Sequence, residues 1–128
     1  MTPLALPLLY CVVCMQCGDR WCAVVQVSGT TYVELGSPIR LICNATGRHR
    51  APDDIGWYRA GLAIRSNPGT GVVVSKKTVV RRVLMSMLAI ASSRMSDAGR
   101  YSCRTSAGDA ASIDVHILNG QLRHTIQQ

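Results

Sequence analysis

The sequence predicts an all-β protein built as a sandwich of two sheets, and three observations support this fold class. Apolar and polar residues alternate with a period of two in several short runs. Stretches rich in Gly, Ser, Asp and Pro separate these runs, and no segment of helix length has a competing periodicity. With 128 residues, of which 48% are hydrophobic, the chain has room for one packed domain and a leading segment.

Five runs carry the alternation, and each places its larger apolar side chains on one face. One run, VLMSMLAIASS, has its apolar stripe interrupted by Ser86. Turn chemistry separates the runs at residues 66–71, 96–99 and 106–110. The expected inward-facing residues are Ile39, Leu41 and Cys43; Ile55 and Trp57; Leu84, Leu88 and Ile90; Tyr101 and Cys103; and Ile113, Val115 and Ile117.

Two cysteines, a tryptophan and a tyrosine are spaced as in an immunoglobulin-like Greek-key sandwich of V/I-set type. Trp57 lies between Cys43 and Cys103, and Tyr101 precedes the second cysteine by two residues. We therefore expect a disulfide between the two sheets, packed against the tryptophan, in a domain that spans residues 26–118. Closing so long a loop stabilises the fold by on the order of 4 kcal/mol.

The turn before the second cysteine completes this pattern. Asp97 and Gly99 lie in it, and the Tyr101 hydroxyl is expected to bond to backbone upstream as a tyrosine corner. In variable-type domains such an aspartate pairs with a basic residue across the base of the sandwich. Arg81 and Arg82 are the two candidates for that partner.

The first 22 residues have a different composition and resemble a leader. The run PLALPLLYCVV carries no charge and fits the apolar region of a signal peptide, although no small-residue cleavage site follows it. The four cysteines at positions 11, 14, 17 and 22 have an unsuitable spacing for a ferredoxin cluster. A zinc site needs a second pair of ligands, and Cys43 and Cys103 cannot supply it because we expect them to form the disulfide. We expect no metal or other cofactor, and a flexible tail over residues 119–128.

A core disulfide implies an oxidising compartment, so we expect the protein to be secreted or attached to the cell surface. Asn44 begins the glycosylation sequon Asn-Ala-Thr and should point outward, because the adjacent Cys43 points inward. No apolar run approaches the roughly 18 to 20 residues that a membrane span requires.

Residues 70–120 resemble a particular immunoglobulin family more closely. The run GVVV after a Gly-rich turn, the tripeptide LAI before Asp97, and YSCRTSAGDAASIDVHILNG carry this resemblance. They are similar to the second, membrane-proximal immunoglobulin domain of the insect defective-proboscis-extension-response family of neuronal cell-surface receptors. The matching positions in the last run are Ser106, Ala111, Ser112, Val115, His116, Asn119 and Gly120.

The resemblance implies a membrane-tethered receptor with two immunoglobulin domains. Such receptors pair with a partner family of immunoglobulin receptors, and the pairing helps to specify synaptic connections. The contacts are made chiefly through the first domain, which has no counterpart in this chain, so no binding residue can be transferred. The tail QLRHTIQQ departs from the family's Glu-His-Pro continuation.

The leading functional hypothesis is therefore a non-enzymatic extracellular adhesion or recognition module. Tyr58, Arg59 and Arg104, on two predicted strands, are the candidate partner-binding residues. A spacer domain without binding of its own is one alternative. Another follows from the net charge of +7: basic clusters at 48–50, 76–77 and 81–82 could bind anionic glycans or lipid.

Two further classes are disfavoured. Nucleic acid binding is not expected, because no aromatic residues interleave the charged clusters. Catalysis is not expected either, because the histidines at 49, 116 and 124 accompany no nucleophile motif or metal-ligand spacing.

Overall fold

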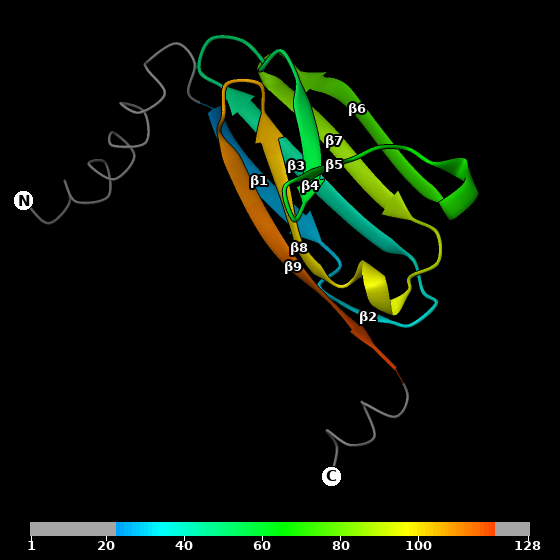
Figure 1. Ribbon diagram of the computed structural model, residues 1–128. Coiled ribbons are helices and arrows are strands. Elements are labelled where there is room, and N and C mark those ends of the chain that lie inside the picture. The colour runs from blue at the N-terminus through cyan, green and yellow to red at the C-terminus, as the bar shows by residue number, and fades with distance from the viewer. Residues whose placement is uncertain (1–22, 120–128) are drawn as a thin grey trace, which may run out of the picture.

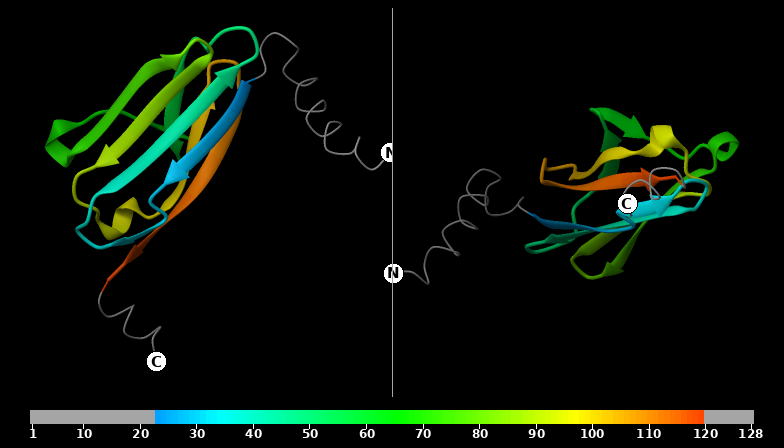
Figure 2. Two further views of the ribbon diagram at one scale, coloured as in Figure 1. Left: turned by 180° about the vertical axis from the view of Figure 1, so that it is seen from behind. Right: turned by 90° about the horizontal axis from the view of Figure 1, so that it is seen from below.

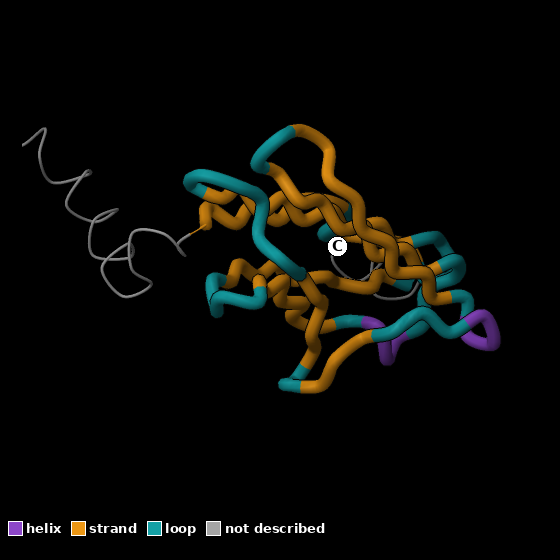
Figure 3. Tube along the Cα trace, turned by 90° about the horizontal axis from the view of Figure 1, so that it is seen from above, coloured by secondary structure: helices purple, strands orange, loops and turns teal. Residues whose placement is uncertain are grey.

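Two β-sheets packed face to face make up the part of the chain that the structure, a computed structural model, describes: residues 23–119 (Figure 1). This confirms the predicted two-sheet sandwich. Viewed from above in Figure 3, the strands form two layers with the loops gathered at their ends. The segments predicted as leader and as most of the tail, 1–22 and 120–128, lie outside the described residues.

The first sheet has four strands in the order β1-β3-β7-β6, all antiparallel, and it lies in front in the left view of Figure 2. The second has five in the order β2-β9-β8-β4-β5, antiparallel except for the pair β2 and β9. The strands are β1 (Ala23–Gly29), β2 (Tyr32–Glu34), β3 (Ile39–Gly47), β4 (Ile55–Arg59), β5 (Leu62–Ile64), β6 (Val72–Val80), β7 (Val83–Ile90), β8 (Gly99–Thr105) and β9 (Ala110–Leu118).

The chain crosses from one sheet to the other between β1 and β2, at Gly29. The φ angle there is +142°, and a Cβ atom would lie 2.2 Å from the carbonyl oxygen of Arg40. Only glycine fits so close an approach without moving the backbone. After this crossing β2 runs parallel to β9, where the His116 amide donates to the Thr31 carbonyl (2.7 Å) and the Leu35 amide to the Leu118 carbonyl (2.6 Å).

The hydrophobic core lies between the two layers and is formed by alternate residues of the strands. β3 shows the alternation most clearly, since every second residue from Ile39 to Gly47 is buried. The inward-facing residues expected in the five predicted runs all line this core or pack against it. The buried hydrophobic residues are Val33, Ile39, Leu41, Cys43, Ala45, Ile55, Trp57, Leu84, Leu88, Ile90, Tyr101, Cys103, Val115 and Ile117.

The structure adds elements that the alternation did not reveal. β1 begins at Ala23, before the expected domain start at residue 26, and β6 lies outside the five predicted runs. β2 and β5 have three residues each. Two of the predicted turns coincide with or overlap a single turn of 3₁₀ helix, η2 (Pro68–Thr70) and η3 (Met95–Asp97). Runs of three residues are too short to display a period of two, so sequence periodicity cannot identify them.

Candidate protein-binding face

A disulfide and the tryptophan beside it fix the two sheets relative to each other. Cys43 on β3 is bonded to Cys103 on β8, with 6.3 Å between their Cα atoms, as the sequence predicted. Trp57 on β4 lies directly opposite Cys103 in the sheet and is almost wholly buried. The frame that carries the surface side chains is therefore held covalently at its centre.

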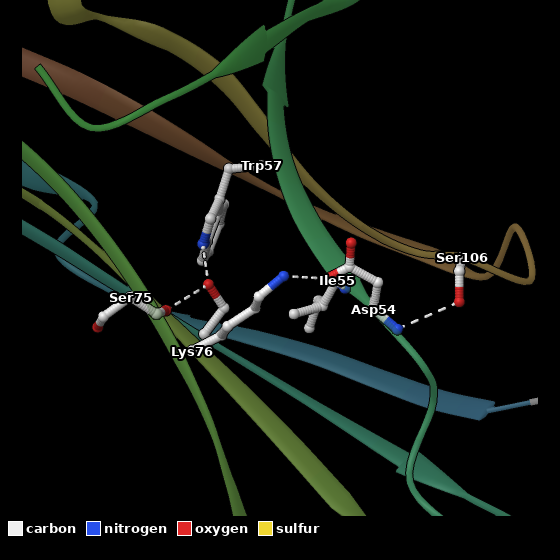
Figure 4. A network of polar contacts seen from close by, with 7 residues as sticks. Asp54, Ile55, Trp57, Ser75, Lys76 and Ser106 are labelled. Atoms are coloured by element: carbon white, nitrogen blue, oxygen red, sulfur yellow. Dashed lines mark hydrogen bonds and ion pairs between the residues drawn. The ribbon is translucent and has the colours of Figure 1, made fainter.

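Ser86 gives the buried tryptophan its hydrogen-bond acceptor. The indole Nε1 of Trp57 donates to Ser86 Oγ (2.9 Å), which in turn donates to the carbonyl oxygen of Ser75 on β6 (2.8 Å) (Figure 4). This chain of bonds crosses from the five-stranded sheet to the four-stranded one. A buried indole N–H requires an acceptor, and this explains why a polar residue, Ser86, stands on the otherwise apolar inward face of β7.

Tyr101 links the base of the sandwich to the turn before β8. Its hydroxyl donates to the backbone carbonyl of Asp97 and accepts from Arg59 Nη1 (3.1 Å), and the guanidinium of Arg59 lies 5.5 Å from the ring centre. Burial raises the pKa of the Tyr101 phenol, and the nearby positive charge of Arg59 partly offsets this. Gly99 opens β8 with a φ angle of +143°, a conformation that favours glycine.

The predicted pairing of Asp97 with Arg81 or Arg82 is wrong. The Asp97 carboxylate instead accepts from the backbone amide of Arg94 (2.8 Å), closing the η3 turn. Arg81 and Arg82 precede β7, whereas Asp97 follows that strand, so the eight residues of β7 separate them. At about 3.3 Å per residue, this distance is beyond the reach of an arginine side chain.

The outer face of the five-stranded sheet carries four pairs of touching side chains, and we call it the polar sheet face. Its members come from β2, β4, β8 and β9, and the strand register brings each pair together. The pairs are Tyr58 with Arg104 (guanidinium to ring centre 5.2 Å), Ser102 with Ser112 (oxygen to oxygen 2.9 Å), Arg100 with Asp114 (nitrogen to oxygen 2.9 Å), and Tyr32 stacked on His116 (ring centres 4.8 Å apart).

The main charged contact on this face is the ion pair between Arg100 and Asp114. Arg100 Nε and Nη2 donate to the two carboxylate oxygens of Asp114, at 2.9 and 3.4 Å. The hydrogen bond from Arg100 lowers the pKa of Asp114, and the same bond raises the pKa of Arg100. Arg104 lies over Tyr58 without an acidic partner in the described residues, so its positive charge is available to an approaching molecule.

The structure brings together two of the three residues expected to bind a partner. Tyr58 and Arg104 share the polar sheet face, but Arg59 points to the other side of β4 and contacts Tyr101. Consecutive residues of a strand face opposite ways, so Tyr58 and Arg59 cannot share a face. Sequence reasoning did not single out Ser102, Arg100 and Tyr32. Strand alternation could have identified Ser102 and Arg100, whereas Tyr32 joins this face only through the pairing of β2 with β9.

A comparison with protein-family models identifies the domain. The model described as "Immunoglobulin domain" matches residues 24–106. The chain belongs to the immunoglobulin domain family. No curated protein sequence matches it significantly.

Two solved structures share the arrangement of this immunoglobulin domain. A chain in the crystal structure of Dpr2 Ig1-Ig2 in complex with DIP-Theta Ig1-Ig3 is 24% identical, with a TM-score of 0.63, and the match covers 76% of this chain and 50% of that one. The N-terminal eight immunoglobulin domains of Down Syndrome Cell Adhesion Molecule (DSCAM) isoform 1.30.30 are 25% identical, with a TM-score of 0.66, over 77% of this chain and 14% of that one. This chain thus spans half or less of either.

The basic clusters of the immunoglobulin domain do not form one continuous face. Arg82 Nη1 donates to the carbonyl oxygen of Arg48 (2.8 Å), which places clusters 48–50 and 81–82 together. Lys76, however, forms an ion pair with Asp54 (Figure 4). The next residue, Lys77, points to the opposite side of β6. The geometry therefore supports anionic-glycan binding less well than it supports a protein-binding polar sheet face.

The described part of the immunoglobulin domain gives no sign of a metal site or a membrane span. No group of three or more His, Cys, Asp or Glu side chains within residues 23–119 is arranged to hold a metal ion. None of the helices in that range has the length and hydrophobicity needed to cross a membrane. The four N-terminal cysteines considered as ligands lie outside it.

Proposed function

We propose that this immunoglobulin domain is a non-enzymatic extracellular recognition module that binds an immunoglobulin-type cell-surface protein through the polar sheet face. The observation that carries the proposal is the set of four contacting pairs on that face. Tyrosine and arginine are the residue types that most often dominate binding energy at protein interfaces, and serine supplies adaptable hydrogen bonds.

The side chains of this face are already held in place before a partner arrives. Arg104 rests on the Tyr58 ring, and the Tyr32 ring is stacked on His116. Binding therefore immobilises fewer free rotamers than it would on a face of isolated side chains, where each costs about 0.5–1.5 kcal/mol. The disulfide beneath β8 adds rigidity to the backbone that carries Arg104.

The partner class and the biological setting are supported by likeness. Residues 70–120 resemble the second domain of the defective-proboscis-extension-response receptors, and the Dpr2 structure shares the fold. That structure holds Dpr2 in complex with DIP-Theta. We accordingly assign the domain to a neuronal cell-surface receptor whose pairing contributes to synaptic partner choice. The disulfide supports an oxidising, extracellular location.

The test is a binding screen of the secreted chain against an array of immunoglobulin-receptor ectodomains, with two arginine variants compared on any partner found. Arg104→Ala should weaken binding by about tenfold or more, as truncation of an interface hot spot does. Arg40→Ala is the matched control, because Arg40 is exposed on the other sheet and faces away from the polar sheet face.

Two results would contradict the proposal. Equal losses from Arg104→Ala and Arg40→Ala would show that the polar sheet face is not the interface. If the correctly folded, secreted chain bound no ectodomain in the screen, the domain would have no recognition function of its own. The role of a spacer domain would then remain.

A further inference from the structure

The outer face of the four-stranded sheet carries a row of apolar side chains along β7, with Arg40 on β3 and Lys77 on β6 beside it. Strand register places Ile42 opposite Met87, and Val73 opposite Ala89, on the side away from the core. We call the six residues that dominate it the apolar sheet face: Ile42, Val73, Val83, Met85, Met87 and Ala89. Val73 is 55% exposed and the others are half-buried. A contiguous row of apolar side chains at a surface is a candidate for cover by another group.

Asn44 lies in the middle of this face. It is on the inner strand β3, opposite Met85 on β7 and Gln26 on β1, and it is half-buried. It also begins the sequon Asn-Ala-Thr, in which Ala45 points into the core and Thr46 shares the outer face. Within the described residues, no hydrogen bond engages the Asn44 carboxamide. The sequon therefore lies at the centre of the apolar sheet face.

We propose that Asn44 carries an N-linked glycan whose first sugars lie across the apolar sheet face and cover Met85 and Met87. The carbon-bound hydrogens of a pyranose ring form an apolar surface that can pack on methionine and isoleucine side chains, while its hydroxyls face water. A glycan is bulky and solubilising, which is what an exposed apolar patch lacks. This inference is independent of the proposed partner, and it leaves the polar sheet face on the opposite layer open.

The modification needs one co-reactant, a lipid-pyrophosphate-linked oligosaccharide. A bond forms between Nδ2 of Asn44 and the anomeric carbon of the sugar, and the bond from that carbon to the pyrophosphate oxygen breaks. The amide proton passes to a base of the transferring enzyme, and no electrons are exchanged. Because β1 and β7 pair with both sides of β3 in the folded domain, transfer must precede sheet formation.

The experiment compares the secreted full chain from eukaryotic cells with two variants at position 46. Thr46→Ser keeps the sequon and Thr46→Ala removes it, while both retain Asn44. We expect a glycan on the wild type and on Thr46→Ser, and none on Thr46→Ala, by intact mass and by the shift after enzymatic deglycosylation. Native wild type that is deglycosylated after folding provides a folded, glycan-free sample if Thr46→Ala does not fold.

Methionine oxidation by dilute peroxide then reports whether the glycan covers the face. Met85 and Met87 should oxidise about threefold or more slowly in the glycosylated chain than in the glycan-free one, because oxidation follows exposure. Met95 is the internal control, since it is 48% exposed on η3 and should oxidise equally in both.

Three results would overturn the proposal. The first is a secreted chain with unmodified Asn44. The second is a glycosylated chain in which Met85 and Met87 oxidise as fast as without the glycan. The third is a glycosylated chain that dimerises and protects both methionines only as a dimer, which would make the face an interface between two copies of the chain.

Discussion

Replacing Ser86 with alanine should destabilise the domain far more than its small change in volume suggests. Trp57 is 1% exposed and Ser86 is wholly buried, so no water can take the place of the lost hydroxyl. The variant leaves the indole N–H without the acceptor that now lies at 2.9 Å, and the Ser75 carbonyl loses a donor at 2.8 Å. One buried unsatisfied donor costs about 1–3 kcal/mol, so we expect a loss of about 2 kcal/mol in the free energy of unfolding.

Urea denaturation followed by circular dichroism measures this loss. For a domain of this size, about 2 kcal/mol corresponds to a fall of roughly 10 °C in Tm. Ser102→Ala is the matched control, because Ser102 forms its 2.9 Å hydroxyl contact with Ser112 on the exposed polar sheet face. That variant should change stability by less than about 0.5 kcal/mol.

A double-mutant cycle separates the hydrogen bond from other effects of the serine. In a Trp57→Phe background the indole N–H is absent, so Ser86→Ala should cost much less than in the wild type. A coupling energy of about 1 kcal/mol or more between the two positions is expected. The reasoning is refuted if Ser86→Ala matches Ser102→Ala, or if the losses at Trp57 and Ser86 simply add.

Two further predictions concern the base and the upper end of the sandwich. Tyr101→Phe removes the hydroxyl that bonds to the Asp97 carbonyl and Arg59, and should cost about 1–2 kcal/mol of unfolding free energy in urea; a Tyr58→Phe control of equal cost would contradict this. The hydrogen bond from Lys76 lowers the pKa of Asp54 below its ordinary value. The pair therefore stabilises the fold fully at pH values above the ordinary aspartate pKa, and this stabilisation is lost as the pH falls through the lowered pKa of Asp54. Asp54→Asn should therefore melt slightly below the wild type at neutral pH, with a loss of at most about 0.5 kcal/mol of unfolding free energy for so exposed a pair. The two melting temperatures should begin to approach each other below about pH 4 and meet once the pH is below the lowered pKa of Asp54. A gap in melting temperature that persists in acid would refute that assignment.

Much of the fold was predictable because its central strands are long enough to show a period. In β3, residues from Ile39 onward alternate cleanly between core and surface, and the Cys43–Cys103 pair with Trp57 then limits the arrangement to one known sandwich. The short strands β2 and β5 were not predictable, because three residues carry no period.

The candidate site was less predictable, because it depends on which strands become neighbours. Alternation indicates that His116 faces outward, but only the parallel register of β2 with β9 shows that Tyr32 stacks on it. Ser86 illustrates the opposite difficulty. As one letter in an apolar run it looks like a defect, and its role emerges only when β7 is placed across the core from Trp57.

The parallel pairing of β2 with β9 has a mechanical consequence. β1 begins at one end of the sandwich and β9 finishes at the other, so a pull on the two chain ends acts along the strands (Figure 1). The bonds between His116 and Thr31 and between Leu35 and Leu118 are then loaded together in shear rather than unzipped one at a time. A domain pulled in this direction should resist extension until the short parallel patch formed by β2 and the residues that flank it ruptures as a unit.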